Sequence, residues 1–123
     1  MGKFSRDKGA RFELQVAGLF REGGYDASRT AQHCGKTGQA ADIKNVPYLH
    51  IECKSCERMH LYDWVEQSDR DCKNEGKGNI PIVVHKANYR PVLVTMHFED
   101  FIELYREWEA GRSLGDGREK DVH

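Results

Sequence analysis

Apolar side chains recur at helical spacing in three stretches of the chain: about residues 8–22, about residues 61–75, and from Glu99 onward. The faces they make consist of Phe12, Val16, Leu19 and Phe20, then Leu61, Trp64, Val65, Ser68 and Cys72, then Phe101, Ile102, Leu104, Tyr105 and Trp108. Glycines follow the first two stretches and predict where those helices end. Beyond Gly111 the chain is rich in glycine and charge, so we expect residues 111–123 to form a flexible tail.

Short segments between these helices predict strands at about residues 25–30, 42–43, 48–55, 80–86 and 91–98. The last two are apolar runs, which suggests burial on both faces. Residues 31–41 are mostly small or polar, as in a loop. The order α-β-β-β-α-β-β-α predicts a mixed sheet flanked by helices, of the α/β or α+β class, with one domain over residues 1–110.

The composition narrows the class of protein. Of the 123 residues, 38% are hydrophobic and 32% charged, and no apolar run is long enough to span a bilayer. The N-terminal segment is charged and has no apolar stretch of the kind found in secretory signals. We therefore expect a cytoplasmic protein with no membrane partner, whose four cysteines stay reduced.

The net charge of −1 conceals an uneven distribution. Residues 1–36 hold seven Lys or Arg and four Asp or Glu, whereas residues 99–123 hold four basic and eight acidic residues. A basic N-terminal third suits a surface that faces phosphates, although ordinary scatter of charge gives the same count.

One acid, Asp42, precedes a strand pattern that carries Glu52 and Lys54. Alternate side chains of a strand point the same way, so Glu52 and Lys54 share a face while Cys53 points to the other. If the strand at Asp42 runs beside this one, the two carboxylates meet and repel unless a cation lies between them. Oxygen ligands suit Mg²⁺, or Mn²⁺ in its place, and such an ion activates water for phosphoryl chemistry.

Two alternatives stay open from the residues alone. Glu-x-Lys is a common pattern and also describes an exposed strand edge with an ordinary ion pair. Glu13 borders the apolar face of the first helix, where it is either a further metal ligand or a boundary residue with a solvated carboxylate.

A zinc site competes for the same residues. Cys53, Cys56 and His60 have ligand-like spacing, and His33 with Cys34 can complete four ligands. A Cys-x-x-Cys pair normally lies on a tight turn, however, whereas Cys53 lies inside a strand pattern. Free cysteines more often serve as small buried hydrophobes, and we expect that role for Cys53 and Cys72.

Taken together, "KGARFE", "GGYDASRT", "GKTGQAADI" and "HIECKS" resemble the PD-(D/E)XK nucleases, in particular the archaeal-type Holliday junction resolvases and their phage relatives. The resemblance covers about residues 8–105 and implies the restriction-endonuclease-like fold. It implies a catalytic set of Glu13, Asp42, Glu52, Lys54 and Gln67, and a metal set of Glu13, Asp42, Glu52 and the carbonyl of Cys53. Two departures are Leu14, where a basic residue is common, and His33-Cys34, where the loop often carries a serine.

The resemblance also implies partners. It predicts a Mg²⁺-dependent endonuclease, a homodimer that cuts four-way DNA junctions in a bacterial or phage-infected cell. Backbone phosphates are then expected to contact Lys8, Arg11, Arg29, Lys36, Lys86 and Arg90. His85 and Asn88 extend that surface or simply end a hairpin, and exposed members of Tyr62, Trp64, Tyr89 and Trp108 are candidates for the dimer face. The alternatives are another repair or restriction-type nuclease, a non-catalytic zinc-stabilised DNA-binding module, and an architectural DNA binder.

Overall fold

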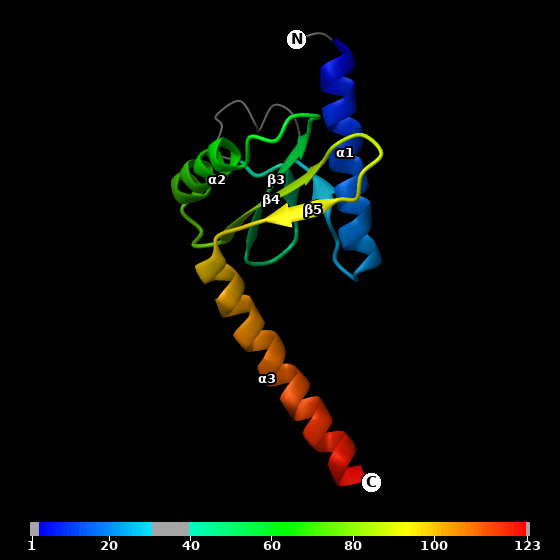
Figure 1. Cartoon of the computed structure of the whole chain (residues 1–123), viewed down its shortest axis with the longest axis vertical. Coiled ribbons are helices and arrows are strands. Elements are labelled where there is room, and N and C mark those ends of the chain that lie inside the picture. Colours follow the sequence, from blue (N-terminus) through cyan, green and yellow to red (C-terminus); the bar gives the residue numbers. More distant parts are fainter. Residues whose placement is uncertain (1–2, 31–39, 123) are drawn as a thin grey trace.

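The computed structural model describes residues 3–30 and 40–122 and shows a five-stranded mixed sheet between two helices, with a third helix that leaves the sheet (Figure 1). The elements are α1 (Lys3–Glu22), β1 (Ser28–Arg29), β2 (Ile43–Lys44), β3 (Leu49–Ser55), α2 (Leu61–Glu75), β4 (Ile80–Lys86), β5 (Leu93–Thr95) and α3 (Phe98–Val122). The strands lie in chain order, and only β3 and β4 are parallel. This confirms the predicted element order and the mixed sheet.

An apolar core lies between α1 and one face of the sheet. Phe12, Val16 and Ala17 of α1 are buried there. They belong to one cluster with buried strand residues, namely Ile43, Ile51, Ile82 and Val84. The helical face predicted from the sequence is therefore the buried one, except that Leu19 is exposed.

The opposite face of the sheet is covered by α2 and is more polar. Trp64, Ser68 and Cys72 of α2 are buried, as the spacing predicts, and the Trp64 ring lies 5.8 Å from the His85 ring. α2 ends at Gly76, whose backbone lies in the left-handed region at φ 72°. Residues with a side chain rarely adopt this conformation, whereas glycine adopts it readily. Because α2 connects two parallel strands, it crosses back over β3 and β4.

The C-terminal segment departs most from the sequence-based expectation. β5 is short, and Leu93 and Val94 are exposed, so the burial on both faces expected for the last predicted strand is wrong. β5 lies at the edge of the sheet, beyond the strands that α1 and α2 mainly contact. The helix after it does not end near Gly111 but continues to Val122, since an isolated glycine weakens a helix without stopping it. α3 projects from the sheet instead of packing on it (Figure 1). Flexibility of residues 111–123 stays a prediction.

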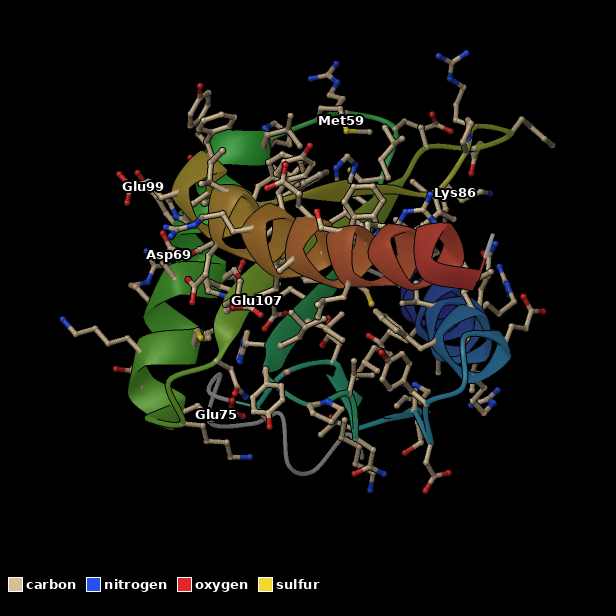
Figure 2. The ribbon with its side chains drawn as sticks, turned by 90° about the horizontal axis from the view of Figure 1, so that it is seen from below. Met59, Asp69, Glu75, Lys86, Glu99 and Glu107 are labelled. Carbon is tan, nitrogen blue, oxygen red and sulfur yellow. The ribbon has the colours of Figure 1, made fainter. Side chains whose placement is uncertain are left out.

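One hydrogen bond ties the start of α3 to α2. His97 Nε2 lies 2.8 Å from Asp69 Oδ2, and the backbone N–H of Phe101 donates to the His97 carbonyl. Asp69 and Glu99 lie on the same side of the molecule, where α3 begins (Figure 2). None of the described helices is long and apolar enough to cross a membrane.

This contact makes stability depend on pH. The hydrogen bond that His97 donates to Asp69, and then the charges of Asp69, Asp100 and Glu99, raise the pKa of His97 above 6.5. The stabilisation is present below that ordinary value and is lost as pH rises through the raised folded-state pKa. Because both side chains are largely exposed, we expect Asp69→Asn to lower the free energy of unfolding by less than about 1 kcal/mol at about pH 5.5 and not at about pH 8.5.

Urea unfolding of the wild type and Asp69→Asn at the two pH values measures this effect. His97→Gln is expected to produce the same loss at low pH. An Asp69→Asn loss of equal size at both pH values would contradict the assignment.

Candidate functional site

Strand β3 separates polar from apolar side chains by alternation. Ile51 and Cys53 face α1 and its apolar cluster. His50, Glu52 and Lys54 face the other way, toward α2. The predicted sharing of one face by Glu52 and Lys54 is therefore what the structure shows.

Asp42 is fixed between two strands immediately before β2. Its backbone N–H donates to the Ile51 carbonyl at 2.8 Å, and its carbonyl accepts from Thr30 N–H at 2.8 Å. Its Oδ2 accepts a 2.7 Å hydrogen bond from the backbone N–H of Cys53. Since β2 is antiparallel to β3, the carboxylate of Asp42 is carried to the side chain of Glu52, as the sequence predicts.

Glu13 approaches the same place from α1. Its Oε1 accepts a 2.9 Å hydrogen bond from Arg29 Nε, and both side chains are partly buried. Arg29 is thus held by an acid of the site rather than directed at solvent. Its Nη2 is buried and has no hydrogen-bond partner among the described residues, so one donor beside the acids is left for another acceptor.

The three acids interact strongly. Burial, followed by the charges of Glu52 and Glu13, raises the pKa of Asp42 to about 8, although the Cys53 N–H bond opposes the rise. In the absence of a cation, protonation of Asp42 near neutral pH is the way this cluster relieves its own repulsion. A cation among these carboxylates would have the same effect.

A row of polar side chains on α2 faces the row on β3. Lys54 Nζ donates to Gln67 Oε1 at 3.3 Å, and His50 Nδ1 lies 3.2 Å from Glu75 Oε1. Asp71 lies between Gln67 and Glu75 along the helix, and partial burial together with the Glu52 charge raises its pKa. Gln67 therefore contacts Lys54, and it is the first of the three α2 residues Gln67, Asp71 and Glu75 that face β3.

His50 links this row to Glu52. Its side chain is fully buried, and its Nε2 lies 3.1 Å from Glu52 Oε1. Burial alone would lower the pKa of His50, but hydrogen bonds to Glu52 and Glu75 outweigh it and raise the pKa. His50, Asp71 and Glu75 were not predicted as site residues. The i, i+4, i+8 spacing of Gln67, Asp71 and Glu75, and the shared parity of His50, Glu52 and Lys54, are signals that would have found them.

The donor chemistry fits a hard divalent cation. Three carboxylates lie close together, and burial, followed by repulsion among them, raises the pKa of Asp42. A cation bound by these oxygens would oppose that rise. Within residues 3–30 and 40–122, however, no three His, Cys, Asp or Glu side chains are arranged as a metal site. Glu13 is held by Arg29, Asp42 by Cys53 N–H and Glu52 by His50, so these oxygens would have to turn to bind an ion.

The zinc alternative finds no support in the described residues. Cys53, Cys56 and His60 do not form a metal-binding group. Burial and the neighbouring acids raise the pKa of the Cys53 thiol far above its usual range, so it stays protonated and is a poor zinc ligand. Cys72 is buried and donates to the Asn79 carbonyl, which confirms its role in the core.

Three of the predicted DNA contacts gather in one hollow of about 290 Å³ beside the acids. Its lining consists of Lys8, Arg11, Phe12, Gln15, Ser55, Lys86 and Asn88. Ser55 and Lys86 are paired last residues of the parallel strands, and Arg11 precedes Glu13 on α1. The predicted contact Lys36, together with His33 and Cys34, lies outside the described residues.

The later hairpin contributes less than expected. His85 is buried, accepts from or donates to Thr95 Oγ1 at 2.8 Å, and has its pKa lowered by burial. A surface role for His85 is therefore wrong, because it faces α2 from the middle of the sheet. Arg90 is exposed in the loop after β4 and does not line the basic hollow.

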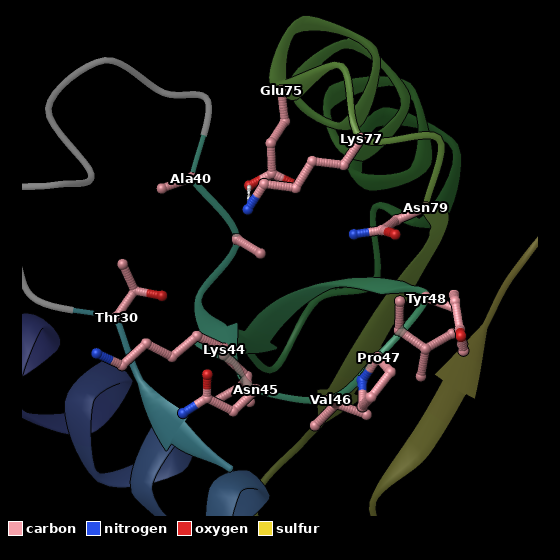
Figure 3. A pocket seen from close by; sticks show the side chains of 13 residues that line it. Thr30, Ala40, Lys44, Asn45, Val46, Pro47, Tyr48, Glu75, Lys77 and Asn79 are labelled. Atoms are coloured by element: carbon pink, nitrogen blue, oxygen red, sulfur yellow. Dashed lines mark ion pairs between the residues drawn. The ribbon is translucent and has the colours of Figure 1, made fainter. Parts of the chain in front are cut away.

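A larger hollow of about 500 Å³ lies between the turn that joins β2 to β3 and the end of α2 (Figure 3). The turn between β2 and β3 forms one wall, with Asn45 at φ 69° and Tyr48 at φ 72°. Glu75 lines the hollow as well as holding His50, and Lys77 Nζ lies 3.9 Å from its Oε2. Of the two hollows, the smaller one is lined by three basic residues, whereas the larger one includes the acid Glu75.

Comparison with known proteins agrees with this geometry. The model of a family described as "Phage putative PDDEXK endonuclease" matches residues 4–114. The solved structure of Archaeoglobus fulgidus Hjc, a Holliday junction resolvase from an archaeal hyperthermophile, is similar with a TM-score of 0.54 and 26% identity over 72% of each chain. No curated protein sequence matches the chain. The fold is therefore restriction-endonuclease-like, and the chain belongs to the phage PD-(D/E)XK endonuclease family.

Proposed function

We propose that this protein is a Mg²⁺-dependent, structure-specific DNA endonuclease, a Holliday junction resolvase that acts as a homodimer in the cytoplasm of the cell in which it is made. The observation that carries the proposal is the meeting of Glu13, Asp42 and Glu52 beside Lys54, in a chain similar to a known resolvase. PD-(D/E)XK nucleases generally use divalent metals, and this acid cluster suits one.

The residues of the site have separable roles in this proposal. Asp42, Glu52, Glu13 and the carbonyl of Cys53 hold the ion. When bound, a divalent cation supplies charge that polarises a phosphoryl oxygen and makes water a better nucleophile. Lys54 orients the attacking water and offsets charge on the phosphate, while Gln67 holds the Lys54 ammonium in place.

The surroundings of the acids suit a nucleic-acid backbone. Lys8, Arg11 and Lys86 offer cations on one side of the site, where phosphate contacts position DNA without reading its sequence. Similarity to Hjc, a resolvase by name, favours junctions over linear DNA as the substrate.

The first prediction concerns cleavage. Glu52→Ala, Lys54→Ala and Asp42→Asn are expected to slow cutting of a synthetic four-way junction with Mg²⁺ by on the order of 100-fold or more. Asp26→Asn, which changes an exposed acid away from the site, serves as the control. Asp42→Asn that cuts at the wild-type rate would contradict the assignment.

A substrate panel tests the specificity. The wild type should cut the four-way junction faster than nicked, flap and linear duplex DNA. A preference for linear or nicked DNA would instead favour another repair or restriction-type nuclease of the same family.

The second prediction has a readout other than activity. Mg²⁺ or Mn²⁺ at constant ionic strength is expected to raise the melting temperature of the wild type, because binding to the folded state alone stabilises it. Glu52→Gln and Asp42→Asn should lose this shift, and Asp26→Asn should keep it. A wild type that neither cation stabilises would argue against a metal site formed by these acids.

The third prediction concerns the basic hollow. Lys8→Ala, Arg11→Ala and Lys86→Ala should each weaken junction binding and reduce the slope of log affinity against log salt by about 1. Lys73→Ala, which removes an exposed lysine from the last turn of α2, is the matched control. Fluorescence anisotropy in the absence of divalent cations, at several salt concentrations, measures junction binding by the three hollow variants and by the control. Equal slopes for the hollow variants and the control would refute the role of the hollow.

A further inference from the structure

An aromatic stripe runs along the exposed first half of α3. It consists of Phe98, Phe101, Ile102, Tyr105 and Trp108. Neighbouring rings lie 6.2, 6.3 and 5.7 Å apart from Phe98 to Trp108, and the Arg112 guanidinium lies 5.7 Å from the centre of the Trp108 ring. These side chains are between 39% and 73% exposed, which is unusual for five large apolar residues on one helix face.

The helix holds this stripe away from the rest of the protein. α3 points away from the sheet, α1 and α2 (Figure 1). In the view from below, it lies in front of the strands (Figure 2). Its start is tied to α2 by the hydrogen bond between His97 and Asp69. A single helix with an apolar face in water lacks the packing that stabilises most helices, so the stripe needs a partner surface.

We propose that the stripe is the dimer interface and that its partner is α3 of a second copy, packed antiparallel. This deepens the dimeric part of the proposed function, and the contact itself is inferred from α3 alone. The four aromatic residues of the stripe and the Arg112 that follows them have the spacing 98, 101, 105, 108 and 112, the 3-4 pattern by which two helices form a seam.

The exposed area is sufficient for such a contact. At about 200 Å² for each large side chain, the exposed fractions correspond to roughly 500 Å² on one helix. Two such faces bury about 1,000 Å² in total, which is near the lower limit for a specific interface. Leu104, partly exposed at the side of the stripe, adds to it.

The pairing of like and unlike side chains favours the antiparallel direction. A parallel pair would set Arg112 of each copy beside the partner's Arg112, which places two like charges together. A two-fold axis near Tyr105 instead sets Ile102 of each copy opposite the partner's Trp108, because both are three residues from Tyr105. The same axis sets Phe98 opposite the partner's Arg112, a cation–π pair. Most of the acids lie on the outer side of the helix, which keeps them in water.

The same helix offers a matched control. Leu114 is 65% exposed and, at 100° per residue, lies on the side of α3 opposite the stripe. Replacing it with glutamine removes as much apolar surface from α3 as a stripe substitution without touching the proposed contact. Glutamine is a good helix former at either place.

Sedimentation equilibrium of the full chain tests the inference. We expect the wild type to be dimeric, Phe101→Gln/Trp108→Gln to raise the dimer dissociation constant by on the order of 100-fold or more, and Leu114→Gln to leave it unchanged. A wild type that is monomeric at about 100 μM overturns the inference. So does a double variant with the wild-type constant, or a Leu114→Gln loss as large as that of the double variant.

A second measurement does not depend on stripe variants. In Trp64→Phe, Trp108 is the remaining tryptophan, and its emission should shift to shorter wavelength as protein concentration rises through the dissociation constant. Emission typical of exposed tryptophan at every concentration would overturn the inference. A short-wavelength emission that does not vary in a monomeric protein would also overturn it, because the helix would then pack on its own chain.

Junction cleavage measured on the same samples separates this inference from the proposed function. A dimer through α3 that cuts no DNA would leave the interface in place and refute the nuclease. A monomer that cuts junctions would do the reverse.

Discussion

The site depends on one geometric match, between alternate residues of β3 and every fourth residue of α2. Side chains two apart on a strand are separated by about 6.6 Å, and side chains four apart on a helix by about 6 Å. Because α2 returns antiparallel to β3, His50 meets Glu75 and Lys54 meets Gln67, with Glu52 and Asp71 between them. The crossover that makes β3 and β4 parallel therefore also builds the polar wall of the site.

Burial gives this wall its electrostatic character. Buried polar groups need hydrogen-bond partners. The buried His50 ring has one at each nitrogen, because it bridges Glu52 and Glu75. Asp42 is held by a backbone N–H, yet its pKa is still raised to about 8, because the carboxyl is buried and two further carboxylates lie close. The protein thus keeps a cluster of mutually repelling acids, as functional sites often do. The separate apolar core under α1 supports the fold independently of that cost.

The third helix, α3, takes no part in the site and leaves its apolar face uncovered. Its aromatic residues contribute little to the core, because β5 ends the sheet and α3 turns away after His97. The sheet can therefore be complete while a large apolar face stays uncovered. A symmetric contact through that face would join two sites without altering either, which suits an enzyme whose proposed substrate has two-fold symmetry.

The residues by themselves predicted the element order, the helix faces of α1 and α2, and the grouping of Asp42 with Glu52 and Lys54, whereas Glu13 was added by the family resemblance. These follow from periods of 3.6 and 2 in the apolar pattern and from the parity of Glu52, Cys53 and Lys54 along one strand. Such local rules hold because β3 is buried and its register is fixed by its neighbours.

Only the tertiary structure decided which distant groups meet. His50 reads as an ordinary strand residue until Glu75 arrives from α2, and Arg29 reads as a DNA contact until Glu13 of α1 accepts its hydrogen bond. His85 reads as a hairpin residue until Trp64 covers it. The pattern on α3 predicts a buried face and cannot tell whether the covering surface belongs to the same chain. Periodicity records that a side chain is shielded from water, whereas the partner that shields it is chosen by the packing of the whole fold.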